Sequence, residues 1–173
     1  MHMGLRGLLT ISVFGVCFVT CTHQPVYELT VVNGHGSGLY EAGTLVDIWA
    51  NVPPGSRFVA WEGDILHLKQ VDTVRGQVAM PAEDVLLEPY FLGQNEVSFR
   101  YEVMPIIQTY CAFVGCHTQS TKQTNFTTYA EVAGVGDKIT SYVESGFMPL
   151  NKSMPAMERQ RLLDWVQQGA LNN

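Results

Sequence analysis

The hydrophobic pattern of this chain changes at the polar tripeptide Gly93-Gln94-Asn95. Before it, over residues 27–92, short runs rich in β-branched and aromatic residues alternate with glycine and proline turns, which is typical of β-strands. After it, apolar residues recur at helical spacing, and the last such run stops at Gly169. The chain has 173 residues, enough for one ordinary domain or two small ones. The change of pattern predicts a β-rich module over residues 22–95 and an all-α domain over residues 96–173.

Each half of the pattern predicts particular elements. The first half indicates five strands, at residues 27–32, 45–50, 57–61, 73–80 and 85–91. Residues 33–38 are rich in glycine but lack the third glycine and the following helix of a dinucleotide-binding loop, so we interpret them as a hairpin turn. The second half indicates a helix whose apolar positions include Val103 and Val114, and one or two short helices within residues 125–143. A final helix contains Met157, which we expect in the core, and ends before Gly169.

The first 21 residues are typical of a secretory signal peptide. Arg6 precedes an apolar run over residues 8–20, which is shorter than the ~20 residues of a membrane-spanning helix. The run ends at Cys21 in a sequence that resembles a bacterial lipobox, which implies lipidation of Cys21. Thr22 replaces the aspartate that retains many lipoproteins in the inner membrane, so the outer membrane is favoured. We therefore expect an exported protein of the periplasm or cell surface, held to the membrane by a lipid anchor; cleavage to a soluble product and an uncleaved anchor are the alternatives.

The charge of the chain limits its partners. The formal net charge is -6, and the sequence has no cluster of Lys and Arg. Nucleic acids are bound through basic surfaces, so the composition argues against a nucleic-acid partner.

The first module resembles a known family. The segments at residues 29–34, 38–46, 58–64 and 79–85 look like the divergent B-repeat of internalin-like bacterial surface proteins. The resemblance implies a compact β-grasp-like unit that is a spacer or adhesion module without catalytic residues. Phe58 and Trp61 would then be core residues and Asp64 a turn residue, although an aromatic ligand-binding face stays open as an alternative.

Two cysteines and a histidine in the second domain have the residue types that covalent haem attachment requires. Each thiol of Cys111 and Cys116 can form a thioether to the porphyrin, and His117 can then bind the iron. Four residues separate the cysteines, whereas the common spacing is two, but the adjacency of Cys116 and His117 is kept. A Cys111–Cys116 disulfide is the main alternative in an exported protein. Zinc is disfavoured because the domain offers no fourth Cys or His ligand.

The iron would also need a sixth ligand or an open position. Since the domain has no other histidine, methionines are the candidates, and Met/His ligation suits electron transfer. Met148, in a loop before Pro149, is best placed, and Met154, which also precedes a proline, is the second choice. Met104 lies too close in sequence to the proximal side.

The second domain also resembles a family, the small c-type cytochrome domain widespread in Bacteroidetes and Planctomycetes. The resemblance is carried by residues 97–99, 103–107, 111–117, 146–149 and 163–170. It implies one covalent haem c on Cys111 and Cys116, with His117 proximal and Met148 distal. Leu150 replaces a proline that the family usually has, and this keeps Met154 open as the distal ligand.

The predicted function is that of an electron carrier with a redox partner protein. No paired carboxylates or nucleophile–base pair accompany the site, so we expect no catalytic turnover. Two alternatives stay open. One is a non-redox surface or adhesion module with a Cys111–Cys116 disulfide, and the other is a haem-based sensor or peroxidase-like protein with an open sixth position.

Overall fold

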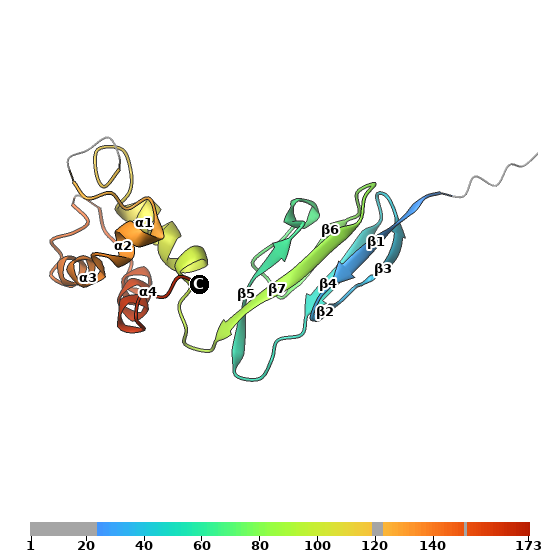
Figure 1. Cartoon of the computed structure of the whole chain (residues 1–173), viewed down its shortest axis with the longest axis horizontal. Helices are drawn as coiled ribbons and strands as arrows, with labels where there is room; N and C mark the ends of the chain where they lie inside the picture. Colours follow the sequence, from blue (N-terminus) through green and yellow to red (C-terminus); the bar gives the residue numbers. More distant parts are fainter. Residues whose placement is uncertain (1–23, 119–122, 151) are drawn as a thin grey trace, which may run out of the picture.

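A computed structural model of the chain describes residues 24–118, 123–150 and 152–173. The expected signal peptide and Cys21 lie outside these residues. The described part is elongated, with the strands at one end and the helices at the other (Figure 1). None of its helices is long and apolar enough to cross a membrane.

Residues 26–93 form two β-sheets. One sheet has the strand order β3-β1-β7-β5, and the other has the order β2-β4-β6. Strands β1 and β7 are parallel, and the other pairings in the two sheets are antiparallel. The strand bounds are β1 Val26–Val31, β2 Gly34–His35, β3 Gly38–Glu41, β4 Leu45–Ala50, β5 Ser56–Gly63, β6 Arg75–Ala79 and β7 Val85–Gly93.

The two sheets share one hydrophobic core. Alternate residues of β4 are buried, as the period of two in a strand requires, and they meet buried residues of β1 and β7. Trp61 is 1% exposed in this core, and its indole Nε1 donates a hydrogen bond to the carbonyl of Thr73 at 3.0 Å. Asp64 lies at the bend between β5 and the 3-10 turn Ile65–His67 and accepts a hydrogen bond from the amide of Leu86 at 2.9 Å, so Trp61 and Asp64 have the core and turn positions expected of them.

Four α-helices follow the strands. A π-helical turn over Phe99–Val103 leads directly into α1, and a 12-residue helix, α4, ends before Gly169, whose φ of 96° favours glycine. Thr128 and Glu131 form a capping box at the start of α2. The helix bounds are α1 Met104–Tyr110, α2 Tyr129–Ala133, α3 Gly136–Glu144 and α4 Ala156–Gln167.

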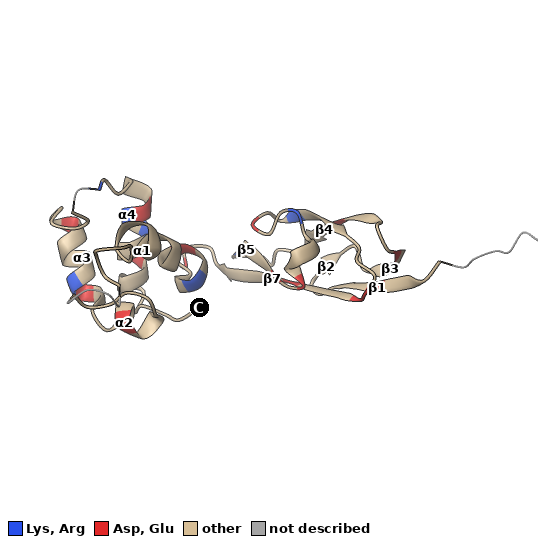
Figure 2. Cartoon of the chain, turned by 90° about the horizontal axis from the view of Figure 1, so that it is seen from above, with Lys and Arg blue, Asp and Glu red and all other residues tan. Residues whose placement is uncertain are grey.

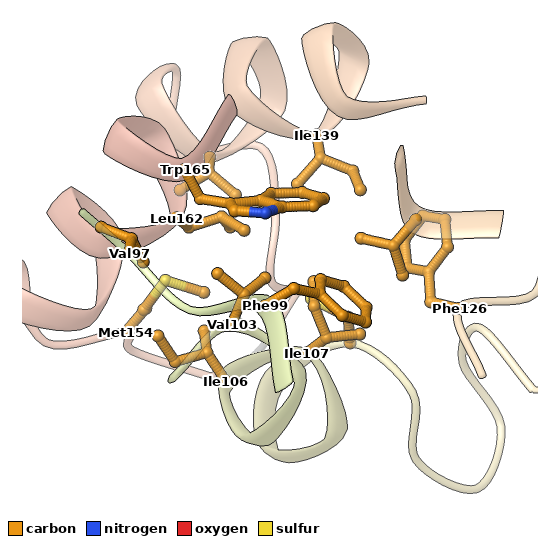
Figure 3. Packing of buried hydrophobic residues seen from close by; sticks show 13 residues of the cluster. Val97, Phe99, Val103, Ile106, Ile107, Phe126, Ile139, Met154, Leu162 and Trp165 are labelled. Carbon is orange, nitrogen blue, oxygen red and sulfur yellow. The ribbon is translucent and has the colours of Figure 1, made fainter. Parts of the chain in front are cut away.

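The helices enclose a second hydrophobic core, separate from that of the sheets. Trp165 and Leu162 of α4 are fully buried against Val103 and Ile107, and Phe99 packs on Trp165 with ring centroids 5.2 Å apart (Figure 3). The indole Nε1 of Trp165 donates a hydrogen bond to the carbonyl of Leu171 at 2.8 Å, which satisfies its buried polar atom.

The fold class expected from the sequence is wrong. The described chain is a mixed α/β protein with seven strands in two sheets and four short helices, and it is not an all-α cytochrome c domain behind a β-grasp-like unit. The glycine-rich run supplies β2 and β3 in addition to turns, and no α-helix occurs among residues 24–98; the one helical turn there is a 3-10 turn at Ile65–His67. The physical reason is that periodicity identifies the type of an element but does not determine which strands pair.

Two acidic side chains connect the sheets to the helices. Glu102 accepts a 2.6 Å bond from Arg57 of β5, and Glu62 accepts bonds from Tyr101 and Arg100 at 2.5 and 2.9 Å. The last residue, Asn173, is bonded to the start of the helical part: the amide of Arg100 donates to its main-chain oxygen at 3.0 Å. These contacts hold the π-helical turn against β5 on one side and against the C-terminal residue on the other.

Candidate functional site

An open pocket lies in the helical part, away from the sheets. Its walls are the loop after α1, one side of α3 and the loop at residues 148–150. The cavity has a volume of about 230 Å³, is open to solvent, and has a mostly apolar surface. An apolar wall with a few polar groups is typical of sites that bind a small organic molecule or cofactor.

The loop after α1 brings Cys111, Cys116 and His117 into the wall of this pocket. Helix α1 ends at Cys111, whose amide still donates to the carbonyl of Ile107 at 2.8 Å. The chain then turns back, with Gly115 at a φ of 88°, and the amide of His117 donates to the carbonyl of Cys111 at 3.1 Å. The four-residue gap is thus closed into a compact loop that presents both cysteines to one cavity.

The two cysteines are not joined by a disulfide. Cys111 is 8% exposed, and burial, with a smaller contribution from Cys116, raises the pKa of its thiol to about 11. The Cys111 sulfur is therefore a neutral thiol at neutral pH.

His117 is held by two contacts from the segment that follows it. Its Nδ1 lies 2.8 Å from the carbonyl oxygen of Thr124, and its ring is stacked on Phe126 with centroids 4.1 Å apart and planes 10° apart. A carbonyl oxygen only accepts hydrogen bonds, so Nδ1 carries the proton and the lone pair is on Nε2. An imidazole that donates its other N–H to a backbone carbonyl is the usual arrangement of a histidine that binds a metal.

The two candidate distal methionines lie in different surroundings. Met148 lines the same pocket as the cysteines and His117, and its amide donates to the carbonyl of Tyr142 at 3.0 Å. Met154 is 5% exposed in the helical core and lies at the opposite end of that core from Phe126 (Figure 3). The pocket thus brings together Cys111, Cys116, His117 and Met148, and it does not include Met154.

Two expectations for other residues of the helical part are wrong. Met157 was expected in the core but is 70% exposed, because it lies on the outer face of α4. Val114 was expected on the apolar face of a helix but is 92% exposed in the loop, because α1 ends at Tyr110.

Sequence reasoning missed several residues of the pocket. Thr124 contributes through its backbone carbonyl, which leaves no signal in the sequence. Phe126, Tyr142 and Lys138 also line the pocket, and only their positions in the folded chain reveal this. An apolar face on α3 could have indicated Ile139 and Val143, but not the cavity that they border.

A donor set for a bare metal ion is not found: in the described ranges, no group of three His, Cys, Asp or Glu side chains is arranged so that it could hold a metal ion. The two thiols, one imidazole and one thioether that line this apolar cavity are the side chains that would attach a haem and bind its iron, to which the porphyrin nitrogens would supply four further ligands. Comparison of the chain with protein family models, curated proteins and solved structures finds no match. Both resemblances noted in the sequence therefore stay predictions.

Proposed function

We propose that the chain is an exported electron carrier that holds one covalent haem c in this pocket. The observation that carries the proposal is the position of His117, whose Nδ1–H is bonded to the Thr124 carbonyl beside two cysteines that line the same apolar cavity. Met148 lines the same pocket, and this position supports it as the second axial ligand of the iron.

Each residue has a distinct role in this proposal. Cys111 and Cys116 would attach the cofactor through thioether bonds, and His117 would bind the iron through Nε2. Phe126, stacked on His117, and the Thr124 carbonyl would keep the imidazole in one orientation. When bound, the haem would supply a one-electron redox centre.

The position of the pocket supports a tethered carrier. The pocket is in the helical part, and the sheets extend from there towards the N-terminal side of the described chain (Figure 1). If Cys21 is lipidated, the strand-rich part would be a spacer between the outer membrane and the haem. The redox partner would then be another exported or surface protein.

The experiment is to express the full chain in a bacterium with a haem-maturation system and to stain a denaturing gel for haem. The proposal predicts a stained band for the wild type, no stain for a Cys111→Ser/Cys116→Ser double variant, and a stained band for a Met157→Ala control. An unstained wild-type band, with soluble folded protein present, would contradict the proposal.

A further inference from the structure

Lys138 is the one side chain with a permanent charge among the described residues that line the pocket. It lies in the first turn of α3, whose Ile139, Tyr142 and Val143 also border the cavity. Lys138 is the only Lys or Arg in α3, and Figure 2 shows a blue, basic segment on that helix. No Asp or Glu belongs to the described pocket wall, although the whole chain has a net charge of -6.

The ammonium group of Lys138 has no partner within the described residues, since they provide it with neither an ion pair nor a side-chain hydrogen bond. Lys152, a second lysine near the pocket, differs in this respect. Its Nζ donates to the carbonyl of Thr109 at 2.5 Å and lies 5.1 and 5.2 Å from the ring centroids of Tyr110 and Phe113. Lys138 can therefore bind an anion at the pocket, whereas the ammonium group of Lys152 is already engaged by a backbone carbonyl and two aromatic rings.

We propose that Lys138 binds a carboxylate of the porphyrin and so fixes how the cofactor is oriented in the pocket. This inference rests on the proposed function. A haem carries two carboxylates, and a carboxylate beside an apolar wall needs a hydrogen-bonding or charged partner. A lysine on a flexible stem is a suitable point charge for such a group. Lys138 is thus a positioning residue for the cofactor.

The test is a titration of the full chain, purified without haem, with two probes. These are ferric protohaem and its dimethyl ester, which has the same porphyrin but no charged carboxylates, and binding is followed by the Soret band. We expect the wild type to bind protohaem about fivefold more tightly than the ester, because this ratio of dissociation constants corresponds to the free energy of an exposed ion pair. Lys138→Gln is expected to reduce this ratio to about one, and Lys138→Arg to retain it.

Lys152→Gln is the matched control, because it removes a neighbouring positive charge from outside the pocket wall. It is expected to keep the wild-type ratio. An unchanged ratio in Lys138→Gln, or an equal loss in both glutamine variants, overturns the role of Lys138 while leaving haem binding intact. If the wild type shifts the Soret band of neither probe, this inference is wrong, whereas the proposed function is decided separately by the haem stain of the chain produced with the maturation system.

Discussion

Single residues of the pocket are held by contacts that differ in kind from those of the core. The imidazole of His117 is oriented by a backbone carbonyl and a stacked ring, and Met148 is in a loop bonded to the end of α3. Met154, in contrast, is packed on all sides in the helical core. Two methionines that look alike in sequence, each before a proline, thus have separate physical roles.

This difference predicts opposite consequences of two substitutions. Met148→Ala should leave the covalent haem in place but convert the iron from low spin to high spin, because an axial ligand is lost. Met154→Ala should keep the low-spin absorption spectrum and lower the free energy of unfolding by roughly 2–5 kcal/mol, because it leaves a cavity in the core. Absorption spectra and urea denaturation of both variants measure these effects. A low-spin spectrum in Met148→Ala together with a high-spin spectrum in Met154→Ala would reverse the assignment.

At the scale of elements, short helices depend on their caps. Helix α2 has only five residues, and the hydroxyl of Thr128 accepts a bond from the amide of Glu131 at 3.4 Å while the Glu131 carboxylate accepts one from the amide of Thr128 at 2.9 Å. The helix positions Val132, which is fully buried in the core.

We therefore predict that Thr128→Ala lowers the free energy of unfolding by about 1 kcal/mol. Thermal or urea denaturation measures the loss, and Thr128→Ser, which keeps the hydroxyl, is the control. Equal stability of the alanine and serine variants would show that the cap does not stabilise α2.

Most elements could be predicted from the sequence, and the exceptions have physical causes. The five expected strands correspond to β1, β4, β5, β6 and β7, and three of the four helices fall where periodicity or glycine breaks indicate. The first helix ends sooner than its apolar spacing suggests, since the chain turns at Cys111. Strands β2 and β3 were missed because they are short and glycine-rich, and they are defined by pairing with β4 and β1.

The candidate site was predictable only in part. Cys116 and His117 are adjacent in sequence and Cys111 is five residues before Cys116, so their proximity could be inferred without a structure. The Thr124 carbonyl, the Phe126 ring and Lys138 reach the pocket through tertiary folding, which no local pattern encodes. The expected fold class failed for the same reason, since the partition of strands into two sheets depends on contacts between distant segments.

For the whole molecule, we expect the contacts between sheets and helices to make the free energy of unfolding depend on pH. Burial, followed by the hydrogen bond to Glu62 and its charge, raises the pKa of Tyr101 from 10.0 to about 12. The pKa of Tyr101 is higher in the folded chain than in the unfolded chain. The contribution of Tyr101 to the free energy of unfolding is therefore complete below pH 10 and is lost as the pH rises towards about 12.

Tyr101→Phe removes both the bond and the titrating group. The wild type should therefore lose stability relative to Tyr101→Phe as the pH rises from 10 to 12, and urea denaturation across this range measures the difference. If the difference in free energy of unfolding between the wild type and Tyr101→Phe is the same at pH 9 and pH 12, the bond from Tyr101 to Glu62 does not make stability depend on pH.

The central claim is that Cys111 and Cys116 hold one haem in the pocket beside His117. The most direct measurement is the intact mass, under denaturing conditions, of the chain produced with a haem-maturation system. The account predicts a mass higher than that of the polypeptide by one haem, with the added mass absent from the Cys111→Ser/Cys116→Ser variant. A wild-type chain with the mass of the polypeptide alone, or of the polypeptide less two hydrogens for a disulfide, would contradict it.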